Sequence, residues 1–450
     1  MAIPNSLVPP APLQLGLSAA IQQVCATPFG VSQLATDCFR RIAELDAELG
    51  CMVHLDVDGA MVRAAELDAL ILNGADPLPL HGMPVIIKEI FSVTDMPDSS
   101  GSRLETPDLF TGEGSFVKQL REAGCVILGK SFSTEFAFAH FNTCRPMPLN
   151  PAIPDELRAT GGSSSGSAAA VAAGYCGLAI GTDTGGSVRV PAALCGVVGF
   201  KPTAGVWPVD GIFPLSKTLD TPGIITNTVE DTAYVFRALS GAHNYAGSVP
   251  ENLRIGVPQD FFTDDLDAEV AAAFAAAKVS INNAGYELVP LQLPAMSSVE
   301  HYFAADLPLE LLTTLGCNRV KHNLDLLDPF TRRRLELVLQ QNAQPFGGGQ
   351  FDQLAAVAEA VLRDAGVTCW ITPTVPCAAA LQSDLHNTDE LVLWQSRASR
   401  NTRCINAMGM TAISLPLPTK QPVGLQIVAP GGAEAELLTL AAMLEPILHA

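Results

Sequence analysis

Helical and strand-like patterns of apolar residues alternate along the chain. Apolar positions recur at three- and four-residue steps over residues 17–50 and 57–73, which predicts helices there. Short apolar runs rich in β-branched residues predict buried strands at 83–90 (MPVIIKEI) and 125–130 (CVILGK). Between these strands, SFVKQLREAG (115–124) has the spacing of an amphipathic helix that ends in glycine. This part of the chain therefore predicts helices interleaved with buried strands.

The same order, a helix and then a strand, returns later in the chain. It is predicted over 168–182 and again over 268–293, and further strand-like runs occupy 253–258 and 369–376. Alternating helices and strands are typical of α/β folds. We therefore expect an α/β fold around a largely parallel or mixed sheet.

The composition is that of a folded protein with a large core. Hydrophobic residues make up 48% of the 450 residues and charged residues only 16%, which excludes an intrinsically disordered chain. The 46 acidic and 26 basic residues give a net charge of −20, and Lys and Arg form no cluster. We therefore expect no nucleic-acid partner. No apolar run approaches the ~18 residues of a membrane span, so we expect no membrane partner either.

The N-terminus and the cysteines bear on where the protein resides. Residues 1–16 have no basic region and are interrupted by prolines, so we expect no signal peptide. The 11 cysteines are scattered, and their spacing fits no common metal site. We therefore expect reduced thiols in a cytoplasmic protein without a bound metal.

Candidate chemistry first appears in a serine-rich segment, TGGSSSGSAAAVAAG (160–174). Because its serines lead directly into small helix-forming residues, they lie at a helix N-terminus rather than in a flexible linker. Serine is a preferred N-cap residue, so helix capping alone would explain them. A second segment, GTDTGGSVRVP (181–191), again places a serine, Ser187, after two glycines. Glycines there allow backbone N–H groups to turn inward, as an oxyanion hole requires.

A serine nucleophile also needs a base. The eight histidines fall in no recognisable motif, whereas Lys88 lies inside the apolar run MPVIIKEIFSV (83–93). Strand alternation alone would put Lys88 on an exposed face as readily as on a buried one. If it is buried, loss of hydration lowers its pKa from about 10.4, and a neutral lysine is a competent general base.

Two further motif matches compete with this interpretation. Residues 162–166 satisfy G-x-S-x-G, but the polar residues 154–160 that precede them do not read as the required strand. Residues 124–131, GCVILGKS, satisfy the phosphate-binding pattern G-x-x-x-x-G-K-[ST]. Their middle residues read as a strand rather than a loop, so we interpret the match as accidental. A nucleotide-binding protein built on this segment remains the alternative from another functional class.

Taken in order, these segments resemble the amidase signature family of serine hydrolases. The resemblance starts at HGMPVIIKEIFSV (81–93) and continues to PVGLQIVAP (422–430). It is densest at ATGGSSSGSAAAVAAG (159–174), at 181–211 and at TLDTPGIITNTVED (218–231). The order and spacing of so many segments make a chance match very improbable.

The resemblance implies a fold and a division of the chain. It implies one large α/β/α domain over residues 1–450, with a mixed central sheet covered by helices. Within it we expect N-terminal helices at 1–75, a core with the catalytic residues at 76–240, and a helical insertion at 296–350 that forms a lid.

The resemblance also implies a catalytic triad of the Ser–cis-Ser–Lys type. By motif position, Ser187 is the nucleophile, Ser163 is the bridging serine on a cis peptide bond, and Lys88 is the base. No cofactor or metal is required. The remaining roles are an oxyanion hole from the N–H groups of Thr184, Gly185, Gly186 and Ser187, and support from Asp183, Arg189, Gly162 and Ser164.

The substrate is expected to be a small amide or carbamate. The apolar, proline-rich segment 139–160, together with 206–216, predicts a pocket for an apolar or aryl group. The chain is also similar to metagenomic urethanases of this family, so we expect aryl amide and carbamate hydrolysis by a monomer or homodimer. A primary-amide hydrolase and the amidase subunit of a tRNA-dependent amidotransferase are the alternatives, and the net charge of −20 counts against the second.

Overall fold

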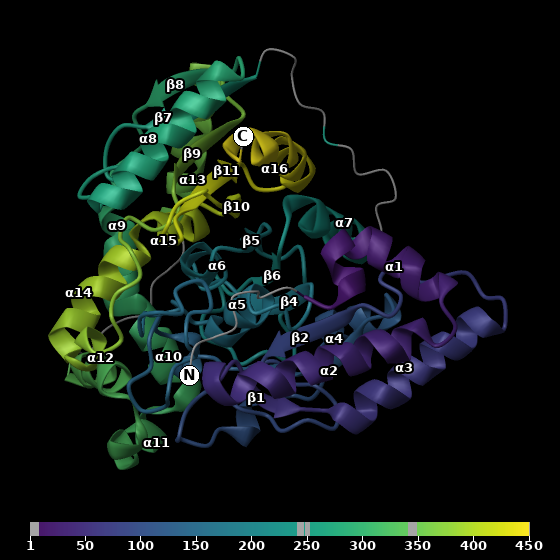
Figure 1. Ribbon diagram of the computed structural model, residues 1–450. Helices are drawn as coiled ribbons and strands as arrows, with labels where there is room; N and C mark the ends of the chain where they lie inside the picture. The colour runs from purple at the N-terminus through teal and green to yellow at the C-terminus, as the bar shows by residue number, and fades with distance from the viewer. Residues whose placement is uncertain (1–8, 241–246, 248–252, 341–348, 450) are drawn as a thin grey trace.

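One mixed sheet of eleven strands organises the computed structural model, which describes residues 9–240, 247, 253–340 and 349–449 (Figure 1). Its strand order is β1-β3-β2-β4-β6-β5-β10-β11-β9-β7-β8. β2 runs parallel to β3 and β4, and β7 runs parallel to β8 and β9, whereas the other neighbours are antiparallel. The strands are β1 (Met52–Leu55), β2 (Pro84–Lys88), β3 (Val126–Ser131), β4 (Leu178–Thr182), β5 (Val198–Lys201), β6 (Pro222–Thr226), β7 (Arg254–Pro258), β8 (Glu287–Leu291), β9 (Cys369–Pro373), β10 (Thr411–Pro416) and β11 (Gly424–Ala429).

Helices surround this sheet, so the predicted α/β fold with a mixed, helix-covered sheet is confirmed (Figure 1). Among the described residues, no helix combines the length and the apolar character that a membrane crossing needs. The helices are α1 (Leu17–Ala26), α2 (Gly30–Leu49), α3 (Val57–Leu72), α4 (Ser115–Glu122), α5 (Ser165–Ala172), α6 (Arg189–Cys195), α7 (Val229–Ser240), α8 (Ala268–Asn283), α9 (Ser297–His301), α10 (Leu307–Leu315), α11 (Cys317–His322), α12 (Pro329–Gln340), α13 (Gly349–Ala365), α14 (Thr388–Ala398), α15 (Arg400–Ala407) and α16 (Glu434–Leu448).

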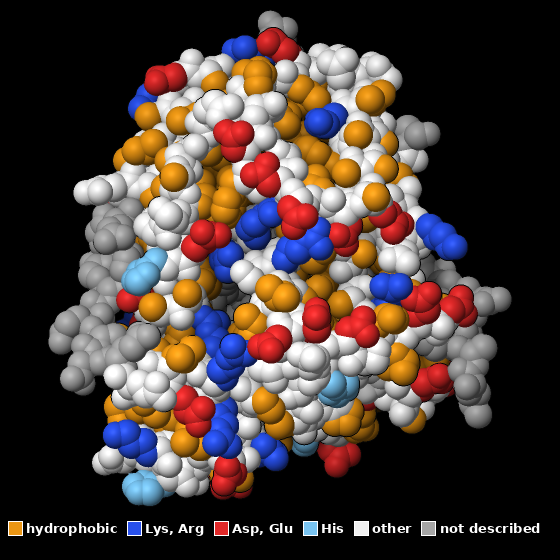
Figure 2. All heavy atoms as spheres, turned by 90° about the vertical axis from the view of Figure 1, so that its left-hand side faces the viewer, with side chains coloured by type: hydrophobic (Ala, Val, Ile, Leu, Met, Phe, Trp, Pro, Cys, Tyr) orange, Lys and Arg blue, Asp and Glu red, His pale blue; other side chains and the backbone are white. Residues whose placement is uncertain are grey.

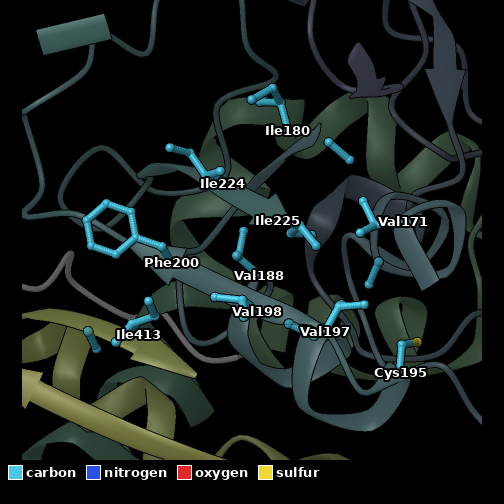
Figure 3. Close-up of a cluster of buried hydrophobic side chains, with 14 of the residues drawn as sticks. Val171, Ile180, Val188, Cys195, Val197, Val198, Phe200, Ile224, Ile225 and Ile413 are labelled. Carbon is cyan, nitrogen blue, oxygen red and sulfur yellow. The ribbon is translucent and has the colours of Figure 1, made fainter. Parts of the chain in front are cut away.

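The hydrophobic core packs closely where the two serine segments meet the sheet. Figure 3 shows Val188, the residue after Ser187, among buried side chains that include Val198 and Ile225. Glycines leave room for it, since a Cβ on Gly181 or Gly223 would lie 3.0 or 2.9 Å from Val188 Cγ2. The backbone that carries Ser187 is therefore anchored by a buried side chain.

The segment expected to form a helical lid, 296–350, is helical over α9–α12, while its residues 341–348 lie outside the described residues. Two contacts tie it to the rest of the chain. The Asp328 carboxylate accepts hydrogen bonds from the amide and the hydroxyl of Thr143, each at 2.7 Å. Arg103 donates to the carbonyl oxygens of Asp325 and Leu326, each at 3.0 Å. These contacts attach residues 325–328 of the segment to the rest of the chain.

Candidate active site

Lys88 ends the central strand β2, and its side chain is completely buried. β2 lies between β3 and β4, and both of its faces are covered, so strand alternation exposes none of its residues. The amino group of Lys88 donates to Ser163 Oγ at 2.7 Å and to Thr182 Oγ1 at 2.8 Å. Burial lowers the pKa of Lys88 to about 7, although the carboxylates of Asp220 and Asp183 act in the opposite direction. A large share of this lysine is therefore neutral near pH 7.

Ser163 lies in the loop before α5, and the peptide bond between Gly162 and Ser163 is cis. The carbonyl oxygen of Ser163 accepts a hydrogen bond from the amide of Thr134 at 3.2 Å. Ser164 links this loop to the second serine segment, because its amide donates to the carbonyl oxygen of Ser187 at 3.1 Å. Lys88 and both serine segments therefore meet at one place.

Helix capping does not explain the serine run. Ser164 occupies the N-cap position of α5, but its hydroxyl donates to the carbonyl oxygen of Thr182 at 3.3 Å and bonds no N–H group of the helix. The hydroxyl of Ser165 is buried without a hydrogen-bond partner among the described residues. The glycine at 161 has φ of +72°, which suits a residue without a side chain.

Ser187 follows β4 and precedes α6, with 5% of its surface exposed. Its neighbours Asp183 and Arg189, which were expected to support the site, form an ion pair with 2.8 Å between Asp183 Oδ1 and Arg189 Nη2, and both side chains are fully buried. Burial favours a raised pKa for Asp183, but the Arg189 guanidinium outweighs it and holds the pKa well below the usual range. This pair fixes the ends of the turn that carries Ser187.

The oxyanion hole inferred from the resemblance loses one of its four donors. The amide of Gly186 donates to Asp183 Oδ1 at 2.7 Å and is therefore already occupied. The amides of Thr184, Gly185 and Ser187 have no hydrogen-bond acceptor in the described part of the chain. Three free N–H groups in one turn remain available to a developing negative charge.

Helix α15 supports this turn from a distant part of the chain. Thr402 Oγ1 donates to the carbonyl oxygen of Gly185 at 2.8 Å, and Asn406 Nδ2 donates to that of Asp183 at 2.9 Å. Gly186 has φ of +120°, and a Cβ there would lie 2.0 Å from Thr402 Oγ1, so only glycine fits.

Sequence reasoning did not single out Thr182, Asp220, Thr402 or Asn406. Asp220 accepts a hydrogen bond from Thr184 Oγ1 at 2.6 Å, and burial raises the pKa of its carboxyl to about 6. Thr182 and Asp220 lie inside the densest segments of the family resemblance, 181–211 and 218–231, and Asn406 lies in a later one, INAMGMTAISLP (405–416), so those segments contained a usable signal. Thr402 has no such signal, because its role depends on how α15 packs.

A cavity of about 450 Å³ opens beside Ser187. The segments 139–160 and 206–216, which were expected to form it, contribute Ala139, His140 and Leu215. This expectation was wrong for most of the wall. The larger part comes from the helical segment 297–340 and from α14 and α15, which lie far away in the sequence.

Comparison with known proteins decides the family, because the Amidase family model matches residues 33–438. The chain belongs to the amidase family. A 2-amino-5-chloromuconic acid deaminase from Comamonas testosteroni is 34% identical over 431 residues, which cover 92% of each protein. A mandelamide hydrolase from Pseudomonas putida is 31% identical, over 92% of this chain and 88% of that protein.

Two further comparisons cover nearly the whole amidase. The A subunit of the glutamyl-tRNA(Gln) amidotransferase of Nitratidesulfovibrio vulgaris is 31% identical, over 96% of this chain and 97% of that protein. A crystal structure of an amidase matches with a TM-score of 0.83 and 27% identity, over 96% of this chain and 99% of that one. The protein is thus an amidase signature hydrolase that acts on amide C–N bonds.

His140 of this amidase borders the cavity but does not have the properties of a base. Its Nδ1 donates to the carbonyl oxygen of Gly162, and its backbone amide donates to Gln395 Oε1 at 2.5 Å. Burial lowers the pKa of His140 to about 4, so the ring is a weak proton acceptor. The contact with Gly162 gives it a structural role beside Ser163.

The competing motifs are accounted for by the fold. Most of GCVILGKS (124–131) forms the buried strand β3, so its backbone pairs with β1 and β2 instead of cradling a phosphate. Lys130 donates to the carbonyl oxygen of Pro97 at 2.7 Å. Among the described residues, no strand directly precedes the G-x-S-x-G match at 162–166. The nucleotide-binding alternative is therefore contradicted.

Proposed function

We propose that this amidase is a serine hydrolase that cleaves aryl amides and aryl carbamates through an acyl-enzyme. The observation that carries the proposal is the 2.7 Å contact between the amino group of Lys88 and Ser163 Oγ, both fully buried. In this scheme, Ser187 is the nucleophile, Ser163 relays protons, and Lys88 is the base. The hydroxyl of Ser187 has no hydrogen-bond partner in the described part of the chain and borders the cavity, so it is free to approach a substrate.

The first half of the reaction moves two protons and forms one bond. Neutral Lys88 takes the proton of Ser163, which takes the proton of Ser187 as Ser187 Oγ attacks the carbonyl carbon. The amides of Thr184, Gly185 and Ser187 stabilise the oxyanion, and one such donor is worth about 3 kcal/mol in comparable sites. The relay then returns a proton to the leaving nitrogen, and the C–N bond breaks.

The second half regenerates the enzyme. The departing amine leaves an acyl group on Ser187, or an alkoxycarbonyl group if the substrate is a carbamate. Water donates a proton into the same relay and attacks the ester carbon, and Ser187 leaves with the proton that Lys88 returns. No step of this scheme requires a metal or a cofactor.

The preference for aryl substrates rests on the cavity wall. Phe138, Phe303 and Phe330 border the cavity, and aromatic side chains bind planar rings through offset or edge-to-face contacts. A similar protein is named a mandelamide hydrolase, and mandelamide carries a phenyl ring on the acyl side of a primary amide, so this similarity supports an aromatic ring in the pocket but not an N-aryl amide. A small primary amide would leave much of a 450 Å³ cavity unfilled.

The similarity to amidotransferase A subunits favours a second candidate, in which the chain releases ammonia from an amide for a partner enzyme. Assay of the isolated chain separates the two candidates. Hydrolysis of 4-nitroacetanilide without partner chains or tRNA supports the aryl amidase. Activity that appears only when the other amidotransferase subunits are added supports the alternative.

Mass spectrometry tests the nucleophile directly. A 4-nitrophenyl N-alkylcarbamate should release nitrophenol and leave a carbamoyl group on Ser187, which peptide mapping locates. Ser187→Ala should carry no adduct. Ser165→Ala is the matched control, because this neighbouring buried serine has no role in the scheme. An adduct on another residue, or one that persists in Ser187→Ala, contradicts the assignment.

A further inference from the structure

Three arginines border the cavity beside Ser187. Arg333 pairs with Asp389 at 2.6 Å, which leaves Arg334 and Arg403, and these two belong to different helices. Arg334 lies in α12, and Arg403 lies in α15 directly after Thr402, which holds Gly185. The backbone of Gly185 packs against Arg403, since a Cβ on Gly185 would lie 3.5 Å from Arg403 Cβ. The Cβ atom of Arg403 therefore lies next to the turn that carries the nucleophile.

Arg403 is buried with little compensation of its charge. It is 8% exposed, and its Nε has no hydrogen-bond partner in the part of the chain that the structure describes. The carboxylate that pairs with Arg403 is that of Glu300, whose Oε1 lies 3.8 Å from Arg403 Nη2. The side chain of Glu300 is 53% exposed. Such a long contact to a half-exposed carboxylate neutralises a buried guanidinium poorly.

The charge of Arg334 is compensated even less than that of Arg403. Among the described residues, no carboxylate lies within ion-pair distance of Arg334, and it donates to the carbonyl oxygen of Phe303. Its guanidinium carbon lies 4.7 Å from the ring centre of Phe138 and 5.4 Å from that of Phe330. Burial lowers the pKa of Arg334 to about 10, and the charge of Arg403 acts in the same direction.

Arg189 is a useful comparison, because it is a buried arginine with a structural role and its charge is fully paired. That arginine is fully buried, and it meets the Asp183 carboxylate at 2.8 Å and donates to Gln426 Oε1 at 2.6 Å. Arg334 and Arg403 have no such carboxylate, although the chain carries a net charge of −20. Figure 2, which views the molecule from the side of α12 and α14, shows Lys and Arg side chains around a hollow in the middle of this face, with Asp and Glu side chains next to them.

We infer that the substrate of this site carries a carboxylate away from its scissile amide, and that Arg334 and Arg403 bind it. This inference rests on the proposed function and narrows its substrate class to carboxylate-bearing amides, such as the monoanilide of a dicarboxylic acid. A carboxylate can accept two hydrogen bonds from the planar donors of a guanidinium. It would also supply the negative charge that no close carboxylate of the described residues gives to Arg334 and Arg403. The aromatic wall contacts the apolar remainder of the same molecule.

The catalytic test compares two chromogenic substrates of equal length. The mono-4-nitroanilide of glutaric acid carries a carboxylate where the 4-nitroanilide of pentanoic acid carries a methyl group. We expect kcat/KM to be at least tenfold higher for the acid anilide. Arg334→Gln and Arg403→Gln should each lower that preference at least tenfold, mainly through KM, and Arg403→Lys should retain part of it.

Arg332→Gln is the matched control, because Arg332 lies in the same helix and pairs with Asp325 and Glu336 outside the cavity. It should change the preference less than twofold. Equal kcat/KM for the two anilides in the wild-type enzyme overturns the inference. If Arg334→Gln and Arg403→Gln lower kcat/KM equally for both anilides, the inference is also overturned, because a purely structural role would give that result.

A binding measurement separates this inference from the proposed function. In Ser187→Ala, calorimetry with succinate, glutarate and adipate should detect binding of at least one dicarboxylate, weakened at least tenfold by Arg403→Gln. If the dicarboxylate binds but no anilide is cleaved by the wild-type enzyme, the proposed function fails and the carboxylate site stands. If none of the three dicarboxylates binds more tightly to Ser187→Ala than to the same protein with Arg403→Gln added, the carboxylate site fails, whatever the enzyme hydrolyses.

Discussion

At the scale of single residues, the charge state of Lys88 governs the proposed chemistry. Its amino group is held between the hydroxyls of Ser163 and Thr182, where water does not reach it. Desolvation destabilises the ammonium form, so the group exchanges its proton near neutral pH instead of near the pKa of an exposed lysine. A base with such a pKa is deprotonated often enough to act and still strong enough to accept a proton.

The pH dependence follows from the lowered pKa of Lys88. Because the pKa falls to about 7, the lysine is protonated below that pH and neutral above it. We expect kcat/KM for 4-nitroacetanilide to rise through about pH 7 and to level off on the alkaline side. A profile that stays flat from pH 5 to pH 9 argues against a lysine base, and Lys88→Ala should abolish the rise together with the activity.

The two serines should differ in how much activity they control. Ser187→Ala removes the nucleophile, and kcat should fall by roughly 10⁵-fold or more, while the oxyanion hole and substrate binding keep the rate above that of the uncatalysed reaction. Ser163→Ala should lower kcat by about 10²- to 10⁴-fold, the range of general acid–base catalysis, because water can replace part of the relay. Steady-state kinetics give both values, and circular dichroism checks that each variant is folded. An equal or larger loss in Ser163→Ala contradicts the relay.

At the scale of secondary structure elements, Arg189 joins four of them. It opens α6, pairs with Asp183 after β4, and donates to Gln426 in β11 and to Asn406 in α15. Strands and helices that are distant in sequence therefore meet at one buried guanidinium. The turn that carries Ser187 keeps its shape because these elements hold both of its ends.

Replacing Arg189 should unfold the protein more readily. Arg189→Met leaves the Asp183 carboxylate buried and unpaired, and loss of one partner of a buried pair costs about 3–5 kcal/mol. Urea denaturation measures the free energy of unfolding of this variant and of Arg189→Met with Asp183→Asn. The second change removes the unpaired charge and should recover part of the loss. A loss below about 1 kcal/mol in the single variant contradicts this account.

At the scale of the whole molecule, the sheet consists of two consecutive parts of the chain. Strands β1–β6 form one half and β7–β11 the other, and the antiparallel pair β5–β10 joins them. Helices also make contacts across this junction. Helix α6 of the first half packs against β10 and β11 of the second, and α16 of the second half packs against α7 of the first as well as against β10. The turn that carries Ser187 lies in the first half, but α15 and much of the cavity wall belong to the second.

Because these contacts depend on both halves, we expect the chain to unfold as one cooperative unit. Differential scanning calorimetry should show a single transition, with loss of activity at the same temperature. Arg189→Met, which weakens the junction, should lower the temperature of that transition without splitting it. Two separate transitions in the wild-type protein contradict the single-domain prediction.

Local sequence was enough to predict α3, α4, α8, β2, β3 and β7 to within a few residues, because helix periodicity and β-branched runs depend on near neighbours. The predicted helix over 17–50 is interrupted at Phe29, which adopts a left-handed φ of 56° that apolar spacing does not reveal. Order and spacing also predicted that Lys88, Ser163 and Ser187 act together, and the structure places the amino group of Lys88 2.7 Å from Ser163 Oγ.

Other features depended on contacts between residues far apart in the chain. Strands β5, β6, β10 and β11 were not predicted from apolar spacing, because they are short, buried on both faces and stabilised by antiparallel partners elsewhere. The burial of Lys88, the occupied amide of Gly186 and the arginines of the cavity likewise became apparent only in the folded chain. Burial and the pairing of charges are set by which side chains pack together, and hydrophobic patterning does not encode those partners.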